Sequence, residues 1–162
     1  MQNKIINIDS IGGLHKQFKY LDPKHPLVSV MDFDKMSKDD YLDGISYNLS
    51  FYAVLLKAAK GSVKYGRGHY DFDEGTLMFT GPNQIIAAKP DAEVKGWGLF
   101  FHPDLLNRTE LGKHIYDYSF FNYESTEALH VSEDEQLVLE ECIKNIEKEA
   151  SQNIDKHTQK LL

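Results

Sequence analysis

The hydrophobic positions near the N-terminus first follow a helical spacing and then a strand-like one. Ile11, Leu14 and Phe18 recur three and four residues apart behind Ser10, a residue type that commonly caps helices. The sequence therefore predicts one short helix between Ser10 and Phe18. Two prolines follow, and the apolar run 27–33 then predicts a first strand.

From residue 44 to residue 102 the spacing is that of β-strands. Beyond Tyr52 both faces are apolar, which indicates a strand that runs from an exposed edge into a covered region. The apolar positions of its continuous face are Tyr47, Leu49, Phe51, Ala53 and Leu55. Turn residues separate further short runs at 62–65, 69–73, 76–80, 84–88 and 94–102. This pattern predicts an antiparallel sandwich or barrel.

After residue 102 the pattern becomes helical. Ser132 and Glu135 have the spacing of a capping box, so we expect the clearest helix to begin at Ser132. Its apolar stripe consists of Leu139, Cys142, Ile143, Ile146 and Ala150. The stripe needs a cover, which either the chain's own barrel or a second copy could supply. We expect one more helix from about residue 154, and the chain stops there without a cap, which predicts that the parent protein continues.

Composition and charge exclude several classes of function. The chain has 162 residues, 41% of them hydrophobic, and a net charge of −7, so it has enough apolar residues for one core and repels phosphates on average. We therefore expect no nucleic-acid binding by this chain alone. Cys142 is the single cysteine, which rules out an internal disulfide, and the sequence has neither a signal peptide nor an apolar run that could span a membrane. These features predict a cytoplasmic protein.

The densest group of chemically active residues lies between residues 65 and 75. Strand alternation places His69 and Asp71 on one face, and Glu74 follows at the next turn. A histidine and two carboxylates could hold iron or manganese. The alternative interpretation is a polar outer strand with solvated acids, which we prefer.

The segment 74–84 resembles the turn-strand-turn element of the cupin barrel. Metal-binding cupins have histidines where this chain has Asp71 and Ala87. Six blocks together resemble the N-terminal half of AraC-type transcriptional regulators. These blocks are His-Pro-Leu-Val-Ser-Val at 25–30, Tyr-Gly-Arg at 65–67, Tyr-Asp-Phe at 70–72, Glu-Gly-Thr-Leu at 74–77, Gly-Trp-Gly-Leu-Phe-Phe-His-Pro-Asp-Leu-Leu at 96–106 and Glu-Ala-Leu-His-Val-Ser-Glu at 127–133.

The AraC resemblance implies an architecture and a function. It implies an N-terminal arm over 1–26, a cupin-like antiparallel barrel (a double-stranded β-helix) over 27–102, and a helical dimerisation or linker segment over 103–162. It further implies a homodimer that senses a small-molecule effector, sugars among them, and that reaches DNA only through a C-terminal helix-turn-helix domain absent from this chain. Neither catalysis nor a cofactor is expected.

Four residues are candidates for contacting an effector. Lys57 follows the apolar face that contains Tyr47, and a cation there could pair with a carboxylate or a hydroxyl-rich ligand, or it could mark where the strand reaches water. Trp97 stands between two glycines, which leave room either for a ligand or for the close packing of another backbone. Tyr65 and Tyr47 are candidates by their hydroxyls and their positions in the barrel.

Two other functions stay open at this stage. One is a metal-dependent cupin enzyme that uses His69, Asp71 and Glu74, and the other is a dimerisation scaffold without an effector. The candidate dimerisation residues are Leu139, Cys142, Ile143 and Ile146.

Overall fold

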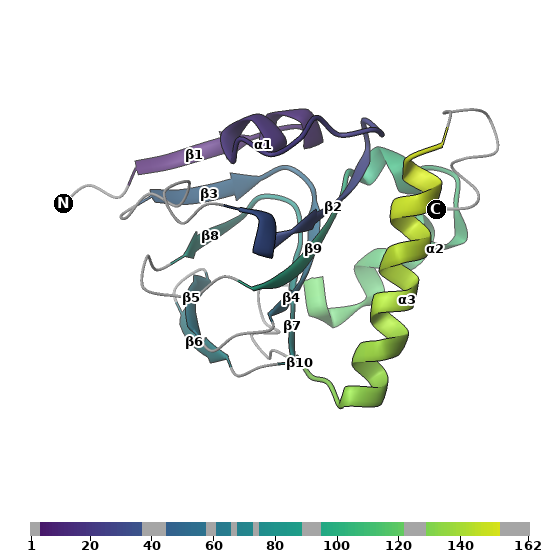
Figure 1. Cartoon of the computed structure of the whole chain (residues 1–162). Helices are drawn as coiled ribbons and strands as arrows, with labels where there is room; N and C mark the ends of the chain where they lie inside the picture. The colour runs from purple at the N-terminus through teal and green to yellow at the C-terminus, as the bar shows by residue number, and fades with distance from the viewer. Residues whose placement is uncertain are drawn as a thin grey trace.

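Two five-stranded sheets and one long helix form the computed structural model (Figure 1). It describes residues 4–36, 45–57, 61–65, 68–72, 75–88, 95–121 and 129–152, with the backbone alone for 61–65, 68–72 and 87–88. Sheet A has the order β1 (Lys4–Ile8), β3 (Ile45–Leu49), β8 (Gln84–Ala88), β5 (Gly61–Tyr65) and β6 (Gly68–Phe72). Sheet B has the order β10 (Leu129–His130), β7 (Thr76–Thr80), β4 (Tyr52–Lys57), β9 (Gly96–Phe101) and β2 (Val28–Asp32).

All strand pairs are antiparallel except the β1–β3 pair, which is parallel. The prediction of a mainly β chain with a C-terminal helix is confirmed. Among the described residues, no strand of one sheet pairs with a strand of the other. The two sheets therefore face each other as separate layers and do not form a closed barrel. The short runs predicted at 62–65, 69–73, 76–80, 84–88 and 94–102 correspond to β5, β6, β7, β8 and β9.

The long strand predicted through Tyr47 and Leu55 is wrong, because the chain turns between the two sheets. β3 ends at Leu49 and β4 begins at Tyr52, with Phe51 fully buried at the corner. The backbone N–H of Ser50 donates to the Ile8 carbonyl (3.1 Å), which fixes the corner to the end of β1. Because both strands keep the same parity through the corner, their apolar faces still point toward one core.

The N-terminal arm is part of the core, and its strand β1 was not predicted. β1 extends sheet A, and the predicted helix follows as α1 (Ile11–Gln17), with the Gly13 N–H donating to the Ser10 hydroxyl (3.0 Å). Ile11 and Leu14 are almost completely buried. The predicted division between an arm and a sheet domain at residue 26 therefore does not coincide with the packing. β10 likewise joins sheet B from within the predicted helical segment.

Sheet B separates two hydrophobic cores. The first core lies between the sheets and under α1, and it includes Leu49, Phe51 and Phe100. The second core lies on the other side of sheet B and includes Tyr52 and Phe101. Since β4 contributes to both, its sequence is apolar on both faces, as predicted.

Short helices and α3 (Glu133–Ala150) cover the outer face of sheet B (Figure 1). The short ones are the 3-10 helices η3 (Pro103–Leu106), η4 (Ile115–Asp117) and η5 (Ser119–Phe121), and α2 (Glu110–His114). A further 3-10 helix, η1 (Phe33–Lys35), follows β2 and contributes Phe33 to the first core. The predicted capping box at Ser132 and Glu135 is present. The helix predicted from residue 154 lies outside the described residues. None of the described helices is both long and apolar enough to cross a membrane.

The apolar stripe of α3 packs against the chain's own sheet. Ile143 and Ala150 are buried, Leu139 and Ile146 are half-buried, and α3 lies against β2. Cys142 is a correction, because it is exposed rather than part of the buried stripe. The exposed apolar residues of this helix are instead Leu137 and Val138, with 65% and 61% of their surface accessible. Three of the four candidate dimerisation residues are therefore covered within the monomer.

Candidate functional site

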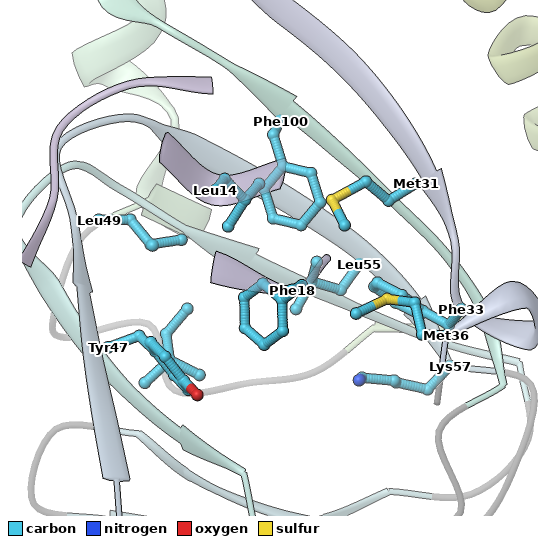
Figure 2. Close-up of a pocket in the computed structure, with 11 residues that line it drawn as sticks. Leu14, Phe18, Met31, Phe33, Met36, Tyr47, Leu49, Leu55, Lys57 and Phe100 are labelled. Carbon is cyan, nitrogen blue, oxygen red and sulfur yellow. The ribbon is translucent and has the colours of Figure 1, made fainter. Parts of the chain in front are cut away.

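A small pocket opens between the two sheets beneath α1 (Figure 2). Its volume is about 90 Å³. Its walls come from α1 (Leu14, Phe18), from β2 and the η1 region (Met31, Phe33, Met36), from sheet A (Tyr47, Leu49, Ile86) and from sheet B (Leu55, Lys57, Phe100). Nine of these eleven side chains are apolar, so the pocket is a hydrophobic space with two polar groups, Tyr47 and Lys57.

Glycine at position 98 makes this wall possible. A Cβ atom there would lie 2.7 Å from Cζ of Phe33 and 2.7 Å from Cε2 of Phe100, closer than packed atoms approach. The absent side chain therefore lets two aromatic rings close over β9. The sequence left open a ligand or the close packing of another backbone at this glycine, and the structure instead shows two aromatic side chains there.

Lys57 is a buried cation at the end of β4. Only 8% of its surface is accessible, and its Nζ lies 4.8 Å from the centroid of the Phe33 ring, within the range of a cation–π contact. Burial lowers the pKa of the Lys57 ammonium from 10.5 to about 8. The structure thus decides against the interpretation that Lys57 marks the point where the strand reaches water.

Tyr47 supplies the second polar group, from β3. Its hydroxyl is buried, and no atom of the described residues is placed to hydrogen-bond with it. Burial raises the pKa of this hydroxyl, and the nearby Gln17 side chain opposes the shift without reaching hydrogen-bond geometry. Figure 2 shows the Tyr47 oxygen and the Lys57 nitrogen both directed into the lower part of the pocket. An unsatisfied buried hydroxyl is costly, so it favours a ligand or water at this point.

The size and lining of the pocket restrict what it can hold. Apolar cavities of about 150 Å³ admit a ring such as benzene, and drug-sized ligands need roughly 300–1,000 Å³. A ligand of this pocket is therefore small, or it displaces a wall to enter. Its polar part is expected to contact Lys57 and Tyr47, since the other described lining residues are apolar.

The other predicted ligand residues lie elsewhere or are not described. Trp97 is on the opposite face of β9 from Phe100, and its buried Nε1 has no hydrogen-bond partner among the residues the structure describes. Tyr65 ends β5, whose side chains are not described. The structure therefore brings Tyr47 and Lys57 together and places Trp97 outside the pocket.

The residues of the predicted metal site lie outside what the structure describes in atomic detail. His69 and Asp71 are on β6, opposite Lys64 and Ser62 of β5, and only their backbone is described. Glu74 lies outside the described residues. Within the described part of the chain, no three His, Cys, Asp or Glu side chains form a group that could hold a metal ion.

The residues that close the pocket on its α1 side were not predicted from the sequence. Leu14 and Phe18 of α1 contribute to it, and His15 fastens the same helix to sheet B. The buried His15 contacts the Leu21 carbonyl through Nδ1 and the Ser29 hydroxyl through Nε2, at 2.7 Å for the second pair. A carbonyl only accepts, so Nδ1 donates to the Leu21 carbonyl. The helical spacing revealed a buried face of α1, but not what that face covers.

No protein-family model matches the chain, and no curated protein matches it either.

Proposed function

We propose that this chain is the effector-sensing and dimerisation domain of an AraC-type transcription regulator, with a cupin-like fold. The observation that carries the proposal is the pocket between the sheets, where a mainly apolar lining surrounds a buried amine and a buried hydroxyl that has no hydrogen-bond partner among the described residues. The mainly β chain with a C-terminal helix supports the proposal, and the cupin-like fold is the finer part that we propose. The site has the features of a receptor for a small molecule.

A chain of contacts leads from the pocket to α3. An effector would touch Phe18 on α1, and the His15–Ser29 hydrogen bond joins α1 to β2. The other side of β2 lies under α3. An effector that binds one position of α1 more tightly than another would therefore shift the position of α3, and with it any domain that follows.

Effector binding is testable by thermal stability. A ligand present at a hundredfold excess over its Kd raises the free energy of unfolding by about 2.7 kcal/mol. We expect such a shift from small, mainly apolar molecules with one acceptor group, in a panel of short-chain acids, aldehydes, aromatic acids and monosaccharides. Gly98→Ala should weaken binding by at least about tenfold, because the new methyl group drives Phe33 and Phe100 into the pocket. Gly12→Ala, where the added methyl group would meet no described atom within 4 Å, is the matched control.

A panel in which no compound stabilises the protein would contradict the sensor function. It would favour the second candidate, a dimerisation scaffold without an effector. The small volume of the pocket is the observation that supports this second candidate.

We further propose a homodimer formed through the outward face of α3. Its exposed Leu137 and Val138 are apolar, whereas the stripe below them is already covered. Sedimentation velocity is expected to detect a dimer, and Val138→Glu should convert it to a monomer without lowering the melting temperature. Glu147→Lys, at an exposed position about 130° around the helix from the midpoint of Leu137 and Val138, should leave the dimer intact. A wild-type protein that stays monomeric at high concentration would contradict this proposal.

A further inference from the structure

Lys57 is a primary amine held at the wall of an apolar pocket, with Nζ directed into it (Figure 2). We propose that Lys57 binds its ligand covalently, as an imine with a small aldehyde or ketone. The inference rests on the proposed function, since it requires that the pocket admits an effector. It extends that function by naming the chemical class of the effector, an aldehyde or a ketone, and the imine bond that would hold it.

The surroundings of Lys57 favour a neutral nitrogen. Taking an ammonium out of water is costly, and a neutral imine does not carry that cost. A pKa of about 8 leaves roughly a quarter of the Lys57 side chains as neutral amine at pH 7.5, against about 0.1% for a lysine at 10.5. Desolvation in a hydrophobic pocket is a known route to a nucleophilic lysine.

The reaction needs no group beyond the amine and the carbonyl compound. The lone pair of Nζ attacks the carbonyl carbon and forms a carbinolamine. The carbinolamine then loses water, in which the carbonyl oxygen leaves with the two hydrogens of the amine, and a C=N double bond remains. Tyr47, on another wall of the same pocket, is the residue that can donate a hydrogen bond to the departing oxygen.

The lining selects among carbonyl compounds. Apart from Lys57 and Tyr47, the lining residues that the structure describes are aliphatic, thioether and aromatic groups such as Leu55, Met31 and Phe100. A sugar would leave several hydroxyls without partners in such a space, which costs free energy for each of them. The pocket therefore favours a short aliphatic or aromatic aldehyde over a sugar.

Reductive trapping tests the inference on the wild-type protein. The protein is incubated with butanal and sodium cyanoborohydride at pH 7.5, which converts an imine into a stable butylamine, and peptide mapping locates the added groups. We expect Lys57 to be modified at least about tenfold faster than the exposed Lys113. Gly98→Ala should slow the labelling of Lys57 and leave that of Lys113 unchanged. Equal labelling of the two lysines would overturn the inference.

Two comparisons separate this inference from the proposed function. Lys57→Arg keeps the positive charge but has no primary amine, so it should lose the rapid labelling while Lys113→Arg keeps it. Butanoate cannot form an imine. If butanoate and butanal raise the melting temperature equally and Lys57 is not labelled preferentially, the imine is overturned and the sensor function stands. If neither compound raises the melting temperature nor labels Lys57, both proposals fail.

Discussion

Lys57→Met is expected to stabilise the protein at pH 7 while it abolishes effector binding. Methionine keeps an unbranched apolar side chain, one atom shorter than that of lysine, and it removes the buried ammonium that lies over Phe33. The pKa of Lys57 falls from 10.5 to about 8 in the folded state, so folding disfavours its charged form. At 1.36 kcal/mol per pKa unit, the expected gain in the free energy of unfolding is roughly 1–3 kcal/mol.

The gain in the free energy of unfolding of Lys57→Met should decrease as the pH rises. Below about pH 7 the lysine is almost fully protonated in both folded and unfolded states, so the advantage of the variant is constant there. Between about 7 and 10.5 the unfolded chain binds more protons at this site, so the wild type becomes more stable as the pH rises. The difference between the two proteins therefore shrinks over this range. Urea titrations of both proteins at pH 7, 8, 9 and 10 measure it.

A constant difference across these pH values would contradict the burial of the charge. If the variant is less stable than the wild type at pH 7, the Lys57 ammonium makes contacts whose stabilisation exceeds the free-energy cost of its desolvation. Removing a functional charge commonly stabilises a protein, because binding sites retain groups that folding alone disfavours.

Phe51→Ala is expected to cost about 3–5 kcal/mol of the free energy of unfolding. Phe51 is fully buried at the corner between β3 and β4, and its ring lies edge-on to Phe100, with 6.3 Å between the centroids. Alanine would leave a cavity at the point where the two sheets are joined. The loss is a large part of the 5–15 kcal/mol that usually separates folded from unfolded protein.

Urea unfolding of the variant measures this loss, and Phe120→Ala is its matched control. Phe120 lies near Phe79 at 5.2 Å between centroids, but 39% of its surface is accessible. The same substitution there should cost less than about 1.5 kcal/mol. Equal losses at the two positions would show that the corner is not the packing centre of the first core.

Features set by neighbouring residues were predicted correctly. The capping box of α3 depends on two side chains three residues apart, and it forms as expected. β7 and β8 match their predicted bounds, because the turn between them contains Asn83, which adopts a positive φ of 63°. Each of these features is determined within a few residues, so distant parts of the chain hardly affect it.

Features that depend on distant packing were not predicted. The alternation of apolar residues continues through the corner at Phe51, so it gave no sign that the strand changes sheets. Cys142 lies about 80° from the centre of the buried stripe of α3, and the breadth of that stripe depends on the sheet beneath it. β1 is short, and its partner β3 follows far along the chain.

For the candidate site, the alternation of the sequence placed Tyr47 and Lys57 at positions of the same parity, which is a local property of the chain. That the two sheets which contain these residues enclose a pocket, that α1 covers it, and that Trp97 lies on the other side of sheet B depended on the tertiary fold. Sheet B is apolar on both faces, so its sequence cannot indicate which face encloses a space. Which face of sheet B encloses the pocket depends on the free energy of packing both sheets and the helices together.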